Sequence, residues 1–345
     1  MCLTRSLSGR EVSLSVDDTP LLEVKNLKAF FDTPSGLLKA VDDVSFYVRR
    51  GETLGVAGES GCGKSVTCQS ILRLLPSPPV RYEGGEIIFD GQDILKMSKN
   101  KLRELRGGRI AMIYQDPMAS LNPVFTIKQQ LVEAIRNHLP LSSKEAFDLA
   151  FDLLQQVHVP NPETILSSYP FTLSGGMRQR LVIAMALSCS PDLLIADEPT
   201  TSLDVTIQAQ ILKLMKNLKE GSGAAVILVT HDLGILAETA DRIMIMYAGK
   251  VFESGKTRDI IQNAAHPYTQ GLIRSRPTGL ATHNNRLQVI GGSVPSLIDK
   301  PQGCPFHPRC EHAMSECSET FPFAVEIGSG HMVNCWKYAG GGGSL

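Results

Sequence analysis

The chain has 345 residues, of which 43% are hydrophobic and 20% are charged, a composition typical of a globular protein with a large buried core. Its 34 basic and 35 acidic side chains give a formal net charge of −1, which argues against nucleic acid as a partner and against bulk attraction to anionic lipid. No apolar run is long enough for a membrane span, and the N-terminal residues show no apolar signal segment. We therefore expect one large domain with a small additional module, in a reducing compartment.

The first part of the chain alternates between strand and helix patterns. Strand-like patterns cover residues 21–31, 44–48 and 52–57, and the last of these leads into a glycine-rich turn. Apolar spacing from Val66 to Leu75 predicts a helix after the turn, which Pro76 ends. Residues 127–187 are mainly helical in pattern.

A capping box, Ser142 with Glu145 three positions later, is predicted inside that helical stretch. Two further strands, residues 193–197 and 224–230, are too apolar to have a wet face, and an amphipathic helix that Gly221 closes lies between them. Buried strands alternating with helices predict an α/β fold, in which a largely parallel sheet is covered by helices and interrupted by a helical insertion.

The ends of the chain differ from its middle. Residues 1–20 are polar and are predicted to form a mobile tail, and residues 340–345 form a Gly/Ser tail that we exclude from the fold. Residues 278–339 are rich in Pro, Gly, Cys and His and predict a small, loop-rich module with a thin apolar core of its own.

Residues 58–65, GESGCGKS, fit the phosphate-loop pattern G-x-x-x-x-G-K-[ST] between a predicted strand and a predicted helix. The backbone N–H groups of such a loop and the positive N-terminal end of the next helix face phosphate oxygens. Lys64 would reach the β- and γ-phosphates, and the Ser65 hydroxyl would bind Mg²⁺. The nucleotide-binding residues predicted here are Gly58, Ser60, Gly61, Cys62, Gly63, Lys64, Ser65 and Val66.

The strand at residues 193–197 ends in Asp197, and Glu198 follows it. Asp197 would hold Mg²⁺, and Glu198 would polarise the water that attacks the nucleotide. Acidic residues often simply end a strand, so this pair indicates hydrolysis only in combination with the phosphate loop.

Residues 173–177, LSGGM, predict a second helix N-terminus able to bind an anion, with Ser174 as its N-cap and Gly175 and Gly176 after it. The segment resembles the LSGGQ signature of the ATP-binding-cassette (ABC) ATPases, with Met in place of the last residue. The resemblance implies that Ser174, Gly175 and Gly176 contact ATP held by a partner subunit.

Other residues occur in the order of that family. Gln115 resembles the Q-loop glutamine, a further Mg²⁺ ligand, and Asp204 resembles the D-loop aspartate. His231 resembles the switch histidine, and Phe31 is similar to the aromatic residue that stacks on adenine. The resemblance thus implies that Gln115, Glu198 and His231 are catalytic, and that Ser65, Gln115 and Asp197 bind Mg²⁺.

The resemblance spans about residues 21–255 and implies the ABC ATPase fold, which is a P-loop NTPase fold. Its parts would be a RecA-like core, an antiparallel β region and a helical subdomain at about residues 116–184, all within a nucleotide-binding domain of residues 21–277. Residues 266–272 and 303–310, HPYTQGL and GCPFHPRC, resemble the C-terminal extension of dipeptide/oligopeptide importer ATPases.

That closer resemblance implies a peripheral subunit on the cytoplasmic face of the cell membrane, which hydrolyses ATP to drive peptide import. Its implied partners are a second ATPase subunit, two transmembrane permeases that residues 118–123 would contact, and indirectly an extracytoplasmic peptide-binding protein. ATPases for nickel or other peptide-like cargo share these motifs. A soluble ABC protein acting on ribosomes or DNA is disfavoured. Such proteins usually have two cassettes in one chain, a long coiled-coil insertion or basic extensions, and this sequence shows none of them.

Four cysteines lie close together in sequence with the spacing C-x5-C-x6-C-x17-C: Cys304, Cys310, Cys317 and Cys335. In a reducing compartment they indicate a metal site rather than disulfides, and the spacing does not separate zinc from iron–sulfur. The family resemblance implies a [4Fe-4S] cluster that staples the module, with zinc as the alternative. We expect the loss of one cysteine to spare the phosphate loop, which is distant in sequence.

Overall fold

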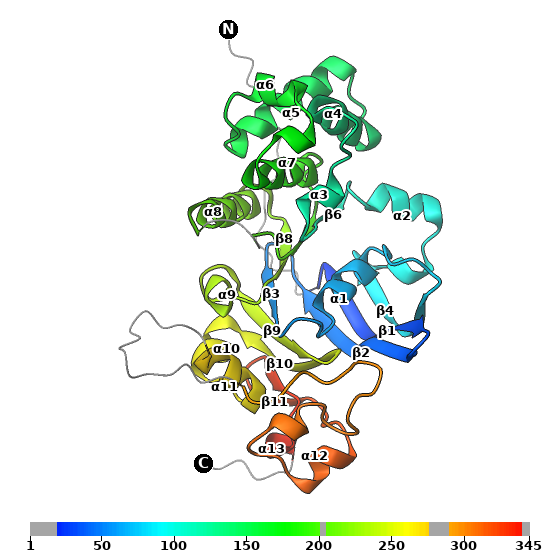
Figure 1. The fold of residues 1–345 in the computed structure, drawn as a ribbon, viewed down its shortest axis with the longest axis vertical. Coiled ribbons are helices and arrows are strands. Elements are labelled where there is room, and N and C mark those ends of the chain that lie inside the picture. The colour runs from blue at the N-terminus through cyan, green and yellow to red at the C-terminus, as the bar shows by residue number, and fades with distance from the viewer. Residues whose placement is uncertain (1–18, 201–204, 276–289, 340–345) are drawn as a thin grey trace.

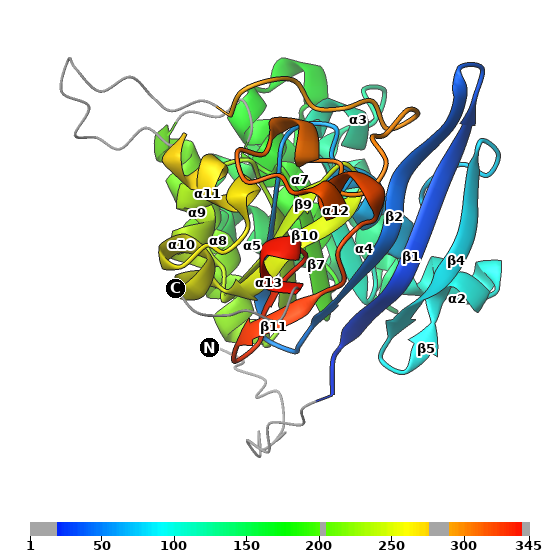
Figure 2. The same ribbon diagram turned by 90° about the horizontal axis from the view of Figure 1, so that it is seen from below.

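The structure is a computed structural model that describes residues 19–200, 205–275 and 290–339. Its strands form two sheets, which Figures 1 and 2 show beside one another. One has four strands in the order β2-β1-β4-β5, and the other has eight in the order β11-β12-β10-β9-β3-β8-β7-β6. The strands are β1 (Leu22–Thr33), β2 (Gly36–Val48), β3 (Thr53–Ala57), β4 (Val80–Phe89), β5 (Gln92–Asp93), β6 (Ile110–Ile113), β7 (Leu193–Asp197), β8 (Ala225–Val229), β9 (Arg242–Tyr247), β10 (Lys250–Lys256), β11 (Val325–Gly328) and β12 (His331–Val333).

The helices cover the larger sheet and form a separate group at one end of the molecule, where α4, α5 and α6 lie in Figure 1. They are α1 (Lys64–Ile71), α2 (Lys99–Leu105), α3 (Pro117–Ser120), α4 (Ile127–His138), α5 (Ser143–Gln156), α6 (Pro162–Ser167), α7 (Gly175–Leu187), α8 (Val205–Ser222), α9 (Leu233–Thr239), α10 (Thr257–Gln262), α11 (Pro267–Arg274), α12 (Ser315–Glu319) and α13 (Trp336–Ala339), with short 3-10 turns η1 (Ile94–Lys96), η2 (Pro170–Thr172) and η3 (His307–Arg309). None of the described helices is long and apolar enough to cross a membrane.

The predicted parallel sheet is confirmed. Strand β3 pairs in parallel with β8 and β9, and β7 pairs in parallel with β8 and β6. Every residue of β3, β7 and β8 is buried, as expected for strands covered on both faces. Because these strands are parallel, the segments that follow β3, β7 and β8 meet at one edge of the sheet.

The predicted helical stretch consists of α4, α5, α6 and α7 with turns between them. The predicted capping box opens α5: Glu145 N–H donates to Ser142 Oγ at 3.3 Å, and Ser142 N–H donates to the Glu145 carboxylate at 2.9 Å. Strand β2 is longer than the predicted residues 44–48. Its first half has no regular buried pattern and its register with β1 shifts, so sequence periodicity did not indicate this part of the strand.

The C-terminal segment, residues 290–339, does not form a separate core. Strand β12 pairs with β10, so β11 and β12 extend the larger sheet. Cys304, Phe306 and Cys317 pack into the same hydrophobic core as the helices of that sheet. The segment therefore packs on the core of the main domain, a contact that sequence periodicity did not indicate.

A buried carboxylate joins this segment to the sheet. Glu253 in β10 is fully buried and accepts hydrogen bonds from the backbone N–H of Ala265 at 2.7 Å and of His266 at 3.0 Å. The His331 ring from β12 lies 2.7 Å from the same carboxylate. His266 is the N-cap of α11, and its Nδ1 accepts a hydrogen bond from Tyr268 N–H at 3.0 Å. A nitrogen that accepts a hydrogen bond carries no proton, so this contact requires the neutral ring.

We predict an acid-labile contact at His266. Burial lowers the pKa of His266 to about 4 from 6.5, although Glu253 partly offsets the shift. The unfolded chain therefore binds a proton between pH 6.5 and 4 that the folded chain does not bind, and stability should fall by on the order of 2 kcal/mol from pH 7 to pH 5.

The measurement is the urea midpoint followed by the fluorescence of Trp336, the only tryptophan, which lies in the C-terminal segment. His266→Asn keeps an acceptor for Tyr268 N–H and should make this midpoint less sensitive to pH, even if it is lower at pH 7. Equal pH dependence in the two proteins would contradict the assignment.

Candidate functional site

The phosphate loop lies between β3 and α1, as predicted. Gly58 has φ +153° and Gly63 has φ +103°, backbone angles that residues with a side chain rarely adopt. A Cβ atom at Gly58 would lie 2.1 Å from Met246 O, and one at Gly63 would lie 2.3 Å from Ala40 O. Only glycine fits at these two points, where the loop packs against both sheets.

The predicted loop residues differ in exposure. Ser60 and Gly61 are exposed at the crest, Cys62 and Gly63 are buried, and Ser65 and Val66 are half-buried at the start of α1. Lys64 is buried, and its Nζ donates to the carbonyl oxygens of Gly58 at 2.8 Å and Glu59 at 3.0 Å. The ammonium group is thus held inside the curve of the loop, on the side where phosphate would bind.

Two of the predicted Mg²⁺ ligands lie side by side. The Ser65 side chain adjoins the Asp197 carboxylate, and Asp197 Oδ1 is buried without a hydrogen-bond partner in the described structure. Burial raises the pKa of Asp197, and the neighbouring Glu198 carboxylate raises it further. A buried oxygen without a partner beside a second carboxylate fits a divalent cation.

The three residues predicted to be catalytic meet at Glu198. This residue has φ +47°, a strained conformation for a non-glycine residue, and its N–H donates to Val229 O at 2.9 Å. Gln115 Nε2 donates to Glu198 Oε2 at 3.1 Å, and His231 Nδ1 lies 3.6 Å from Glu198 Oε1. The Glu198 carboxylate is therefore contacted by side chains from two other loops, those that follow β6 and β8.

The other predicted site residues do not join this group. Phe31 is half-buried in β1 and pairs with Leu38 and Val80 in the four-stranded sheet. Ser174 caps α7, accepting from Met177 N–H at 3.3 Å, and Gly175 and Gly176 begin that helix, which packs on α3, α4, α5 and β6. Asp204 lies outside the described residues.

A contact that sequence analysis did not single out connects the helix α7 to this edge of the sheet. Gln179 is buried, and its side-chain amide donates to Pro199 O at 2.7 Å, directly after Glu198. The available signal was its place just before the apolar run of α7, because a buried amide needs a partner.

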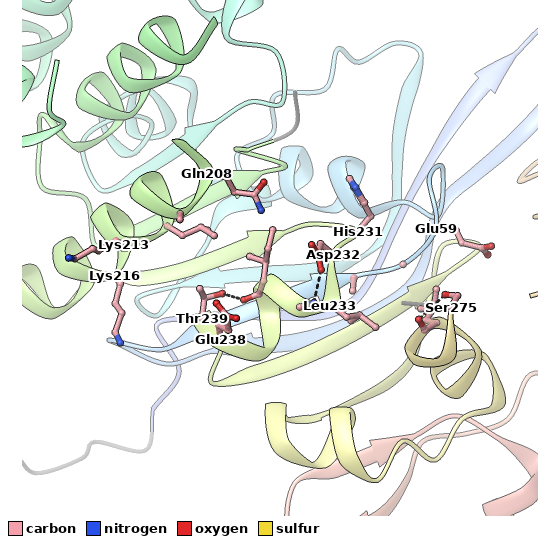
Figure 3. A pocket seen from close by; sticks show the side chains of 17 residues that line it. Glu59, Gln208, Lys213, Lys216, His231, Asp232, Leu233, Glu238, Thr239 and Ser275 are labelled. Atoms are coloured by element: carbon pink, nitrogen blue, oxygen red, sulfur yellow. Dashed lines mark hydrogen bonds between the residues drawn. The ribbon is translucent and has the colours of Figure 1, made fainter. Parts of the chain in front are cut away.

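A pocket of about 850 Å³ opens beside the loop, between α8 and α9. Figure 3 shows His231 and Asp232 on its wall, with Lys213, Lys216 and Glu238 farther along it. Its lining includes Gly58 and Glu59 but not Lys64, Ser65 or Asp197 among the described residues. The pocket therefore adjoins the phosphate loop and is not itself the predicted phosphate site.

The four cysteines of the C-terminal segment are neighbours, but they do not form a metal site in this structure. Burial raises the pKa of Cys304 to about 12 and that of Cys335 to about 11, and nearby thiolates would raise both further. Among the described residues, no three His, Cys, Asp or Glu side chains are grouped so that they could hold a metal ion. The predicted [4Fe-4S] cluster and its zinc alternative are therefore not supported. Cys304 N–H donates to Cys317 O at 2.8 Å, which joins two of the cysteines through the backbone.

Comparison with known proteins agrees with this arrangement. Residues 41–201 match the ABC transporter family, and residues 252–317 match the C-terminal region of oligopeptide/dipeptide transporters. The dipeptide transport ATP-binding protein DppD of Bacillus subtilis is 48% identical over 316 residues, covering 92% of this chain and 94% of its own. The oligopeptide transport ATP-binding protein OppD of the same organism is 45% identical over 318 residues, covering 92% and 89%.

Solved structures show the same fold. A dimeric ATP-binding cassette, MJ0796, bound to ADP and Pi is similar with a TM-score of 0.62 and 27% identity, covering 69% of this chain and 99% of its own. The protein cbiO1 of Clostridium perfringens, part of an ABC transporter complex, has a TM-score of 0.59 with 27% identity, covering 71% and 91%. The chain belongs to the ABC transporter family, among the ATP-binding proteins that carry the oligopeptide/dipeptide transporter C-terminal region.

Proposed function

We propose that this chain binds MgATP at residues 58–66 and hydrolyses it to drive the import of dipeptides or oligopeptides. The observation that carries the proposal is the convergence of three groups at one edge of the parallel sheet: Lys64 in the phosphate loop, the Ser65–Asp197 pair and the Glu198 carboxylate. The names of the most similar relatives support peptides as the cargo.

The proposed chemistry uses the groups as they are placed. Lys64 exchanges the carbonyl oxygens of Gly58 and Glu59 for phosphate oxygens, while the loop N–H groups bind the remaining phosphate charge. Ser65, Asp197 and Gln115 would hold Mg²⁺, which would neutralise charge on the phosphates. Glu198 accepts a hydrogen bond from the attacking water, and Gln115 and His231 orient its carboxylate.

The proposed assembly follows from the position of the signature segment. Residues 174–176 begin α7, away from the phosphate loop of the same chain, so they are assigned to the ATP of a second ATPase subunit. Two permeases and an extracytoplasmic peptide-binding protein complete the transporter, which places this chain on the cytoplasmic face of the membrane. We assign residues 21–277 to the nucleotide-binding domain, 116–184 to its helical subdomain and 278–339 to the C-terminal extension.

The permease contact is assigned to exposed apolar side chains near α3. Met118, Val124 and Phe125 have exposed fractions of 43%, 70% and 45%, and Tyr169 and Phe171 are exposed and stacked on one another. A backbone hydrogen bond from Ile127 N–H to Ser168 O joins the two segments. Large exposed apolar side chains gathered in this way are typical of a protein interface.

The first test replaces the proposed general base. Glu198→Gln should lower ATP turnover of the purified transporter by about 10²- to 10⁴-fold, because the neutral amide accepts no proton from water. Nucleotide occupancy should stay high, since Lys64 and the loop are unchanged. Wild-type turnover in this variant would contradict the assignment of Glu198.

The second test asks whether the signature acts on a partner's nucleotide. A Cβ at Gly175 would meet nothing within 4 Å, so Gly175→Asp should fold, and the isolated chain should bind ATP normally. Activity of the assembled pair should fall by more than about tenfold, because like charges across an interface cost several kcal/mol. Gly175→Ala is the neutral control. Loss of ATP binding by the isolated Gly175→Asp chain would argue against the intermolecular arrangement.

The third test concerns the permease surface. Met118→Asp should weaken assembly with the permeases by about tenfold or more, because a charge would enter an apolar contact. Met314→Asp is the matched control, since Met314 is equally exposed, at 41%, but lies in the C-terminal segment. Co-purification with the permeases is measured together with ATP binding, which neither change should alter. Equal assembly of both variants would refute this surface.

A further inference from the structure

Glu59, the second residue of the phosphate loop, is held at three points. Its carbonyl oxygen accepts from Lys64 Nζ at 3.0 Å, and its N–H donates to the hydroxyl of Tyr268 in α11 at 2.9 Å. Its carboxylate accepts two hydrogen bonds from Arg309, at 2.8 Å from Nη1 and 3.0 Å from Nη2. Two of these contacts come from the part of the chain beyond β10.

Arg309 is itself fixed before it reaches the loop. Its side chain is only 6% exposed, its Nε donates to Gly291 O at 2.8 Å, and Nη1 donates to the Tyr247 hydroxyl at 3.1 Å. It lies in the turn η3, where Arg309 N–H donates to Phe306 O at 2.9 Å. The Glu59 hydrogen bonds raise the pKa of Arg309, so the guanidinium is charged at every relevant pH.

The loop needs this support when nucleotide binds. Lys64 now bonds the carbonyl oxygens of Gly58 and Glu59, and it must release them to reach phosphate. Glu59 also brings a negative charge into a loop that binds a strongly anionic ligand, and a carboxylate without its cation would repel that ligand. Figure 3 shows the Glu59 side chain directed away from His231.

We infer that Arg309 is a positioning residue of the phosphate loop: its two-point contact holds Glu59 away from the bound phosphates and neutralises its charge. The inference rests on the proposed nucleotide site, and it assigns the C-terminal segment a part in ATP binding. It also opposes the expectation that changes near the cysteines spare the phosphate loop, because Cys310 follows Arg309 directly in the chain.

The test compares MgATP dissociation constants of full-length variants. Arg309→Gln should raise the constant by about tenfold, because it leaves Glu59 without its partner, and Glu59→Gln/Arg309→Gln should restore it to within about threefold of wild type. Arg309→Lys keeps the charge without the two-point contact and should raise the constant by only about threefold. A role confined to folding of the C-terminal segment would leave the double variant as weak as Arg309→Gln.

Two controls separate the inference from the proposed function. Arg274→Gln removes an exposed arginine of α11 that donates to Gln270 Oε1 at 3.3 Å, and this variant should bind MgATP as wild type does. Lys64→Ala should lose most binding. Normal MgATP binding by Lys64→Ala would refute the nucleotide site itself. If Lys64→Ala loses binding, then unchanged affinity in Arg309→Gln would refute only the role of Arg309. Failure of the double variant to recover affinity would do the same.

Discussion

The phosphate loop is enclosed so tightly that its backbone geometry constrains the elements around it. Gly63 faces Ala40 O of the four-stranded sheet, and Gly58 faces Met246 O in β9 of the larger sheet, with no room for a Cβ atom at either point. The loop N–H groups can face an anion only while both sheets keep these positions. Packing of the two sheets and binding of phosphate are therefore parts of the same arrangement.

The edge of the sheet concentrates charges that are costly without a ligand. Asp197 is buried, with an oxygen that has no hydrogen-bond partner among the described residues, and Glu198 follows it in a left-handed backbone conformation. Such features lower stability and persist where the ligand compensates for them. The ammonium of Lys64, held on loop carbonyls, supplies part of the opposite charge, and MgATP would supply the cation that the carboxylates lack.

An aromatic cluster packs the C-terminal segment, through Phe306, against β9, β10 and α11. Tyr247, Tyr268 and Phe306 form a cluster with ring centroids 4.7 to 5.4 Å apart, and Phe252 packs on two of them. The hydroxyls of Tyr268 and Tyr247 meet Glu59 N–H and Arg309. The same cluster thus buries apolar surface and presents polar groups to the phosphate loop, which joins the segment to the nucleotide site.

The sequence by itself determined the features that depend on neighbouring residues. The phosphate loop, the capping box at Ser142 and the buried strands were all predictable, because turn geometry, caps and burial leave regular local patterns. The meeting of Gln115, Glu198 and His231 followed only from resemblance to a family, and the structure shows it directly. Tertiary structure alone decided the pairing of β12 with β10, the absence of metal-site geometry among the described cysteines, and the contact between Glu59 and Arg309 across 250 positions. These features depend on residues far apart in the chain that meet only when the sheet and its core have formed, and such contacts leave no periodic signal in the sequence.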